Sequence, residues 1–159
     1  MSKNRIESIT PLANLKNLES LSLDRNRIKS VTSLRNLRKL TYLDLSQNNI
    51  SNISTLRRLT RLAYLNLKRT SVTDISAITK LKNLYSLDLS NTKVRNVAKE
   101  VGKIRSLREL KLVSAGVKSV TPLKNLSRLT VLHLRNNNIK NVSSLNNLKN
   151  LYEIDISKK

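Results

Sequence analysis

The chain has 159 residues and contains no cysteine, tryptophan or phenylalanine, and only one histidine, two glycines and two prolines. Without cysteine it can form no disulfide, thiolate metal site or cysteine nucleophile, and a single histidine excludes multi-histidine metal sites. Two glycines are too few for a glycine-rich phosphate loop, which argues against nucleotide hydrolysis and dinucleotide redox chemistry. We therefore expect no catalytic residue, no metal site and no cofactor.

Long apolar runs are also missing. No run approaches the roughly 18 residues that span a bilayer, and the first ten residues, MSKNRIESIT, lack the apolar stretch of a secretory signal. We expect no membrane span and no signal peptide. If the chain is complete, a cytoplasmic or nuclear location is favoured, and the absence of cysteine fits a reducing compartment.

Acidic residues are scarce, with 10 Asp and Glu against 31 Lys and Arg, so the formal net charge is +21. The apolar residues are mostly Leu, Ile and Val, which is unlike the composition of a disordered chain. With four tyrosines as its only aromatic residues, the chain must fill its core with branched aliphatic side chains. This composition indicates thin, repeated layers.

A repeat fills almost the whole chain, with the pattern LxxLxxLxLxx(N/T)x(I/V)xx(I/V)xx(L/I)xx. The units start at Leu15, Leu37, Leu59, Leu81, Ile104, Leu126 and Leu148, 22 residues apart except for one interval of 23. A partial unit occupies residues 4–14. We interpret residues 1–159 as a single domain built from these units.

Each unit combines two periods. Leu43 and Leu45 alternate with polar residues, which predicts a short strand with one buried face. From Ile50 to Leu62 the apolar spacing is three, which suits 3₁₀ turns better than an α-helix. The predicted fold is therefore a mainly β, formally α/β, curved solenoid with 3₁₀ turns and about seven parallel strands on its concave face.

The combined pattern, LxxLxLxxNxI followed by IxxLxxL, resembles that of leucine-rich repeat proteins, of the short-unit type found in bacterial internalins and in the leucine-rich regulatory subunit of protein phosphatase one. The resemblance covers Asn4 to Ile156. It implies a scaffold that binds proteins on its concave face, although one fold can host unrelated functions. On this basis we expect a protein–protein interaction module that is not an enzyme.

In that family the Asn of each unit forms a ladder that satisfies buried backbone groups after the strand. The ladder positions here are Asn26, Asn48, Thr70, Thr92, Ala115 and Asn137. Because Ala115 has no polar side chain, we expect a locally altered or water-bridged turn there. The extra residue of the 23-residue unit lies in AKEVGK, where Gly102 offers an irregular turn, so residues 97–117 are the expected bend or soft spot.

Neither end carries an obvious cap, so self-association through the ends is expected. The last strand carries Glu153 and Asp155, charges that protect a sheet edge from pairing with another chain. The N-terminal layer is therefore the expected site of self-association.

Strand residues that point away from the core form the predicted concave face, on which acidic and basic residues balance. Tyr42 and Tyr64 fall at the same position of adjacent strands, and Tyr together with Arg is typical of interface hot spots. The alternative is a ring pair that only stabilises the sheet. The candidate partner-binding residues are Tyr42, Asp44, Gln47, Tyr64, Asn66, Lys68, Arg69, Asp88, His133 and Arg135.

The return segments carry only basic charges at their variable positions. We call twelve of these residues the basic stripe: Arg35, Arg38, Lys39, Arg57, Arg58, Arg61, Lys80, Lys82, Lys103, Arg105, Lys124 and Arg128. Such a row along the convex back favours nonspecific binding of nucleic acid or another polyanion, or of an acidic protein, and this is the alternative function. The competing interpretation is a solvated face that keeps the protein soluble.

His133 shares a column with Lys111 and Asp155, and a histidine beside a carboxylate is the start of a catalytic arrangement. No nucleophile or oxyanion site accompanies it in the pattern. An exposed, hydrogen-bonded histidine is the favoured interpretation.

Overall fold

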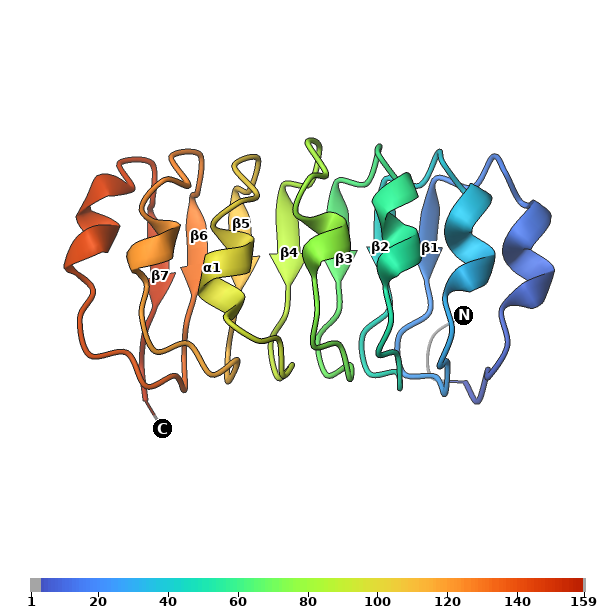
Figure 1. Ribbon diagram of the computed structural model, residues 1–159, viewed down its shortest axis with the longest axis horizontal. Helices are drawn as coiled ribbons and strands as arrows, with labels where there is room; N and C mark the ends of the chain where they lie inside the picture. Colours follow the sequence, from blue (N-terminus) through green and yellow to red (C-terminus); the bar gives the residue numbers. More distant parts are fainter. Residues whose placement is uncertain (1–3, 159) are drawn as a thin grey trace.

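The computed structural model describes residues 4–158, so residues 1–3 and 159 of the predicted domain lie outside the described part. Seven short strands form one parallel sheet in the order of the sequence. The strands are β1 (Ser20–Ser22), β2 (Tyr42–Asp44), β3 (Tyr64–Asn66), β4 (Ser86–Asp88), β5 (Glu109–Lys111), β6 (Val131–His133) and β7 (Glu153–Asp155). Figure 1 shows them side by side along the length of a solenoid. This confirms the predicted curved leucine-rich-repeat architecture.

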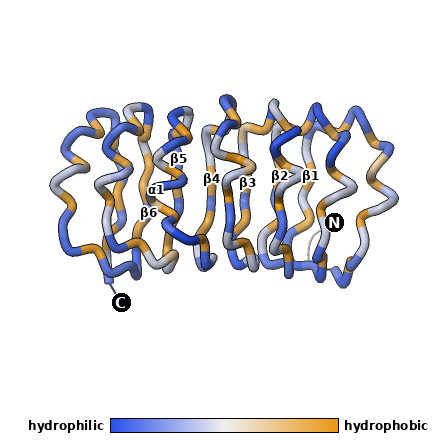
Figure 2. The backbone as a smooth tube through the Cα atoms, viewed as in Figure 1, coloured by the Kyte–Doolittle hydropathy of each residue, from blue (hydrophilic) through white to orange (hydrophobic). Residues whose placement is uncertain are grey.

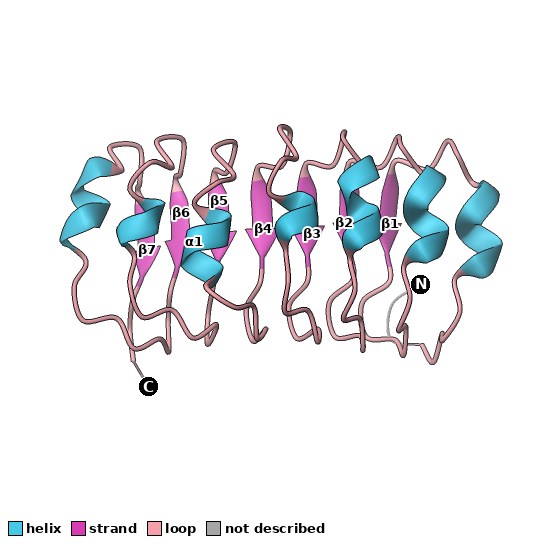
Figure 3. Cartoon of the chain, in the orientation of Figure 1, coloured by secondary structure: helices cyan, strands magenta, loops and turns pink. Residues whose placement is uncertain are grey.

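The return segments lie on the other side of the chain, opposite the strands (Figure 3). In the described residues they form the 3₁₀ helices η1 (Thr10–Asn14), η2 (Thr32–Asn36), η3 (Ser54–Arg58), η4 (Ser76–Ile78), η5 (Thr121–Leu123) and η6 (Ser143–Asn147). The apolar spacing of three predicted this geometry, because side chains at i and i+3 of a 3₁₀ helix lie on the same face. Leu34 and Leu56 accordingly point inward and are fully buried.

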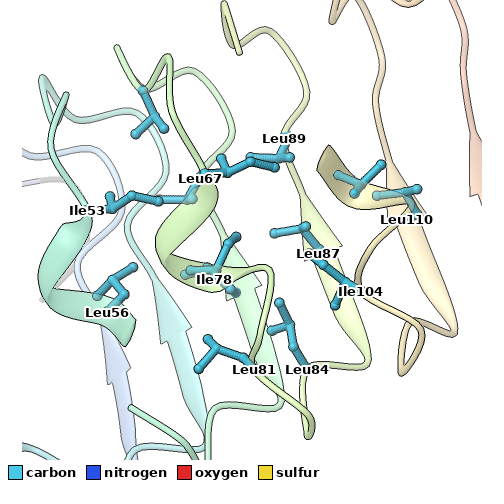
Figure 4. Packing of buried hydrophobic residues seen from close by; sticks show 14 of the residues in the cluster. Ile53, Leu56, Leu67, Ile78, Leu81, Leu84, Leu87, Leu89, Ile104 and Leu110 are labelled. Atoms are coloured by element: carbon cyan, nitrogen blue, oxygen red, sulfur yellow. The ribbon is translucent and has the colours of Figure 1, made fainter. Parts of the chain in front are cut away.

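The core is one continuous aliphatic spine between strands and returns. Leu43 and Leu45 of one unit, and Leu65 and Leu67 of the next, have no exposed surface. Figure 4 shows the side chains of strands and returns meeting in this layer, and Figure 2 shows polar residues gathered along the outer loops. Because each layer is covered by the next, removing a buried leucine would cost about 2–5 kcal/mol of folding free energy.

The extra residue of the 23-residue unit is accommodated on the return side. There the chain forms a short α-helix, α1 (Val97–Val101), in place of a 3₁₀ helix. The sheet is not interrupted, since Ser86, Leu87 and Asp88 of β4 pair in parallel register with Glu109, Leu110 and Lys111 of β5. Gly102 has ordinary helical angles (φ −59°), and its role is a close approach: an added Cβ would lie 2.4 Å from the carbonyl oxygen of Pro122.

The expectation of a disturbed turn at Ala115 is wrong. Asn137 of the following unit extends across, and its Oδ1 accepts hydrogen bonds from the backbone N–H groups of Ala115 at 3.2 Å and Val117 at 2.8 Å. Its Nδ2 donates to the carbonyl of Leu112 at 2.7 Å. Thr70 and Thr92 make one ladder bond each, to the carbonyls of Leu67 and Leu89.

The exposed apolar residues do not gather at the N-terminal layer, which the sequence indicates as the site of self-association. Of the six exposed large apolar residues in the described part of the chain, three lie in the last unit, namely Tyr152, Ile154 and Ile156, and Val142 lies shortly before it. Ile154 occupies the strand position of Leu132, which is fully buried by the next unit, whereas Ile154 is 44% exposed. The C-terminal layer is therefore the more apolar end.

Candidate functional site

The candidate site on the concave face is centred on two tyrosines. Parallel pairing of β2 with β3 places Tyr42 opposite Tyr64. Their rings stack with centroids 4.4 Å apart and planes inclined by 6°. Both side chains are half-buried, so one side of the stack packs on the sheet and the rest stays accessible. The predicted side-by-side arrangement is thus present.

Polar side chains at the ends of the same strands are held in place by their own backbone. Asp44 Oδ1 accepts a hydrogen bond from the N–H of Ser46 at 2.9 Å, and Asn66 Oδ1 accepts one from the N–H of Lys68 at 3.0 Å. Asn66 also donates to Asp44 Oδ2 at 3.1 Å. These bonds restrict the rotamers of both side chains and link β2 to β3 across the site.

Tyr64 has a raised pKa. Burial is the main cause, and Tyr42 and the carboxylates of Asp44 and Asp88 add to it. Each of these factors disfavours the charged phenolate. The phenol of Tyr64 is therefore a neutral hydrogen-bonding group beside two carboxylates.

Other predicted residues lie around or away from this centre. Gln47 and Arg69 both adopt left-handed backbone angles, with φ of 55° and 54°, directly after the strands that carry the tyrosines. His133 lies on β6, three strands from β3 and hence roughly 14 Å away, and Arg135 follows it. The concave candidates thus form a main group around the tyrosines and a separate group that includes His133 and Arg135.

The second group contains ion pairs that the sequence columns did not predict. His133 shares its column with Asp155 in the register of β6 and β7, as predicted. Its ring nevertheless contacts a different carboxylate, because Nε2 lies 2.6 Å from Glu153 Oε1. On the neighbouring strand Glu109 contacts Lys111 at 2.7 Å and accepts a hydrogen bond from Ser86 Oγ at 2.7 Å. The Lys111 hydrogen bond, followed by that of Ser86, lowers the pKa of Glu109, although desolvation opposes the shift.

Acidic residues concentrate on the concave side. Of the 10 acidic residues in the chain, six lie on the strands or directly after them: Asp24, Asp44, Asp88, Glu109, Glu153 and Asp155. Among the described residues, no three His, Cys, Asp or Glu side chains come close enough together to hold a metal ion.

The basic stripe follows one long edge rather than the whole convex back. Its residues lie in the last turns of the return helices and in the links to the next strands, and Figure 1 shows these links along one edge of the solenoid. All twelve side chains are exposed. The stripe has an acidic neighbour at one place, where Glu100 of α1 forms a 2.8 Å ion pair with Lys103.

The structure brings together only part of the stripe. One hollow is lined by five residues of the stripe from three successive return segments, Lys80, Lys82, Lys103, Arg105 and Arg128, together with Thr79, Leu81, Ile104, Ser106 and Ser127. Arg35, Arg38 and Lys39, by contrast, lie near the N-terminal end. Sequence reasoning missed the threonine and the two serines, and the available signal was that earlier units carry Arg or Lys at the equivalent positions.

Comparison with known proteins now identifies the scaffold. A family model for the leucine-rich repeat region matches residues 17–159. The chain belongs to the leucine-rich repeat family. Comparison with curated protein sequences yields no significant match.

Two solved internalins from Listeria monocytogenes are similar to this leucine-rich repeat protein. Internalin InlF has 35% sequence identity and a TM-score of 0.90, covering 96% of this chain and 45% of its own. Internalin C2 has 31% identity and a TM-score of 0.85, covering 97% of this chain and 77% of its own. The chain therefore spans less than half the length of InlF and about three quarters of internalin C2.

A plant protein shares the fold at lower identity. The leucine-rich repeat ectodomain of the membrane receptor kinase GASSHO1/SCHENGEN3 from Arabidopsis thaliana, in complex with CASPARIAN STRIP INTEGRITY FACTOR 2, has 23% identity and a TM-score of 0.82, covering 100% of this chain and 21% of its own. Within residues 4–158 of our leucine-rich repeat protein, no helix is long and apolar enough to cross a membrane. Its cytoplasmic or nuclear location stays a prediction.

Proposed function

We propose that this leucine-rich repeat domain is a non-enzymatic module that binds a protein partner on its concave face, around Tyr42 and Tyr64. The observation that carries the proposal is the stacked, half-buried tyrosine pair on a mainly polar sheet surface. Leucine-rich repeat domains commonly serve protein–protein interaction, in agreement with this use of the face. Tyrosines are frequent hot spots because they bury a large area and have few rotatable bonds.

Preorganisation supports the same proposal. The backbone N–H groups of Ser46 and Lys68 fix the side chains of Asp44 and Asn66, and the rings of Tyr42 and Tyr64 support each other. A surface whose side chains are already ordered loses little conformational entropy when a partner binds. More of the contact energy then appears as affinity.

The charges of the domain set a second requirement for the partner. Near the tyrosines, Asp44 and Asp88 oppose Lys68 and Arg69, so the local surface is mixed, whereas the whole chain carries a net charge of +21. A partner with a net negative charge would be steered toward the domain at long range. Its contact surface must then offer both signs of charge around an anchor that packs on the rings.

The His133–Glu153 pair fits the non-enzymatic part of the proposal. It lies on an open sheet face, with side chains that are 25% and 52% exposed. General acid–base groups in enzymes usually work in concave sites whose environment shifts their pKa values and excludes water. An exposed contact between a histidine and a carboxylate on a sheet is more simply a stabilising contact between β6 and β7.

A test variant and a control variant examine the proposal. Y42A/Y64A removes the aromatic stack, and R57Q/R58Q/R61Q removes charge from the basic stripe on another surface. A protein captured by the wild type and by the stripe variant, but lost with Y42A/Y64A, supports the proposal, and its affinity is expected to fall by at least about 2 kcal/mol. Equal capture by all three correctly folded proteins contradicts it.

Exposure of all twelve residues of the basic stripe favours a second candidate, nonspecific binding of nucleic acid or another polyanion along that edge. Such binding releases counterions, so the logarithm of the binding constant falls linearly with the logarithm of the salt concentration. Measuring the affinity for duplex DNA at a series of salt concentrations tests this candidate. Loss of all binding at roughly 0.15 M ionic strength, where the screening length is about 8 Å, identifies the stripe as a solvated face.

A further inference from the structure

Several hollows border the basic stripe, and we call the one lined by the most basic residues the flank hollow. Its volume is about 590 Å³, within the roughly 300–1,000 Å³ of small-molecule sites. The lining residues are Thr79, Lys80, Leu81, Lys82, Lys103, Ile104, Arg105, Ser106, Ser127 and Arg128. We propose that the flank hollow binds a compact anion that carries several phosphate groups. This goes beyond the concave-face function and uses a different surface.

The hollow exists because short side chains replace long ones at repeated positions. Thr79 occupies the position of Arg35 and Arg57 in earlier units, and Ser106 occupies that of Lys39 and Arg61. Ser127 replaces Arg38 in the same way. The flank hollow therefore lies where short side chains stand at the positions of Arg35, Arg38 and Lys39.

The floor of the hollow is rigid. Leu81 and Ile104 are 3% and 1% exposed and belong to the continuous core. Ser106 Oγ donates a hydrogen bond to the carbonyl of Leu84 at 2.6 Å, which fixes its side chain against the preceding unit. A ligand would thus meet a preformed surface, and binding would order mainly the long cationic side chains.

The lining of the flank hollow is strongly cationic. Five exposed basic side chains contribute to it from three successive return segments: Lys80, Lys82, Lys103, Arg105 and Arg128. A neighbouring hollow of about 390 Å³ shares Lys82, Ser106 and Arg128 and adds Arg108. The nearby carboxylate of Glu100 forms an ion pair with Lys103. An anion placed among the remaining cations would relieve their mutual repulsion and gain charge-assisted hydrogen bonds.

The arrangement favours clustered phosphates over an extended nucleic acid backbone. A duplex presents its charges along a line and would engage the stripe through many units. The flank hollow instead gathers its cations around one point. Among the described residues that line it, none is aromatic, so it offers no ring on which a base could stack.

Calorimetry with sodium tripolyphosphate as the probe, at roughly 0.15 M ionic strength, tests the proposal. The variant K82Q/R105Q/R128Q removes three charges from the rim, and the matched control R35Q/R38Q/R57Q removes three from the same stripe outside the hollow. We expect affinity to fall at least about tenfold in the first and less than about twofold in the second. Equal losses, or no binding by the wild type, would overturn the proposal.

A second variant separates shape from charge. S127R adds a positive charge but fills the hollow, so we expect weaker tripolyphosphate binding despite the higher net charge. Stronger binding by S127R would show that charge alone attracts the anion and would overturn the proposal. A parallel titration with duplex DNA separates the two candidates, since binding along the whole stripe would weaken equally in K82Q/R105Q/R128Q and its control. Duplex binding that is tighter than tripolyphosphate binding and depends on the hollow alone would also contradict a compact ligand.

Discussion

Asn137 supplies the ladder contacts that Ala115 lacks, since its Oδ1 accepts a hydrogen bond from the N–H of Ala115 at 3.2 Å. The same side chain serves two units. It bonds the carbonyl of Leu134 in its own unit and that of Leu112 in the preceding one, both at 2.7 Å. In the first full unit, by contrast, the carbonyl of Leu23 accepts hydrogen bonds from both Asn26 and Asn48. The ladder therefore depends on a single amide at Asn137, whereas two act together earlier in the chain.

We expect N137A to destabilise the domain by more than about 2 kcal/mol, because it leaves several buried backbone groups without partners at about 1–3 kcal/mol each. T92A is the control, since it removes a single bond, from Thr92 Oγ1 to the carbonyl of Leu89. Denaturant unfolding of both variants gives the comparison. Equal losses of stability would show that the reach of Asn137 into the preceding unit contributes nothing.

Gly102 gives a second prediction. Its backbone angles suit any residue, but a Cβ would lie 2.4 Å from the Pro122 carbonyl oxygen and 3.1 Å from that of Ala98. We expect G102A to cost about 1–3 kcal/mol of stability through this overlap. The matched variant G116N places a side chain in open space at a φ of +71°, a conformation that Asn tolerates, and should change stability by less than about 0.5 kcal/mol. A neutral G102A would show that the chain near α1 moves to make room.

The strands, the 3₁₀ returns and the tyrosine stack were predictable because they depend on repeat register alone. Leu43 and Leu45 show the strand, and parallel pairing of equivalent positions puts Tyr42 beside Tyr64. The contacts at Ala115 and His133 were not predictable from register. Asn137 stands at the ladder position equivalent to Ala115, but the rotamer of its side chain decides which backbone groups of the preceding unit it bonds. Glu153 pairs with Val131 in the register, and its side chain crosses diagonally to His133.

Backbone conformation shows the same limit. Arg25, Gln47, Arg69, Asn91, Ser114 and Asn136 are all left-handed, with φ between 52° and 57°. No glycine marks this position, and only two of the six residues are Asn, the type that favours it locally. The ladder and sheet hydrogen bonds on either side impose the turn. Arg25 N–H, for example, bonds the carbonyl of Ser46 at 3.0 Å.

The tyrosine stack yields a third prediction, which separates its structural contribution from its proposed role in binding. A double-mutant cycle with Y42A, Y64A and the double variant should give a coupling free energy of unfolding of about 0.5–1.5 kcal/mol, because the stacked rings contact each other directly. The stabilities come from denaturant unfolding. If the losses of stability are additive, the two rings do not stabilise each other in solution. Each ring would then contribute to the free energy of unfolding only through its own contacts with the sheet.

Glu109 yields a prediction about acid stability. Hydrogen bonds from Lys111 and Ser86 lower its pKa below the ordinary value of 4.5 in the folded protein. A folded pKa below the unfolded one means that the folded state binds the proton less readily, so the stabilisation is fully present above the ordinary pKa. It is lost as the pH falls through the lowered folded value. K111Q removes the main cause, so its stability should fall less than that of the wild type between about pH 6 and about pH 3. K149Q, which removes the same charge from a return segment, is the control and should follow the wild type. A change in K149Q as large as that in K111Q would mean that net charge, and not the contact with Glu109, sets the acid sensitivity.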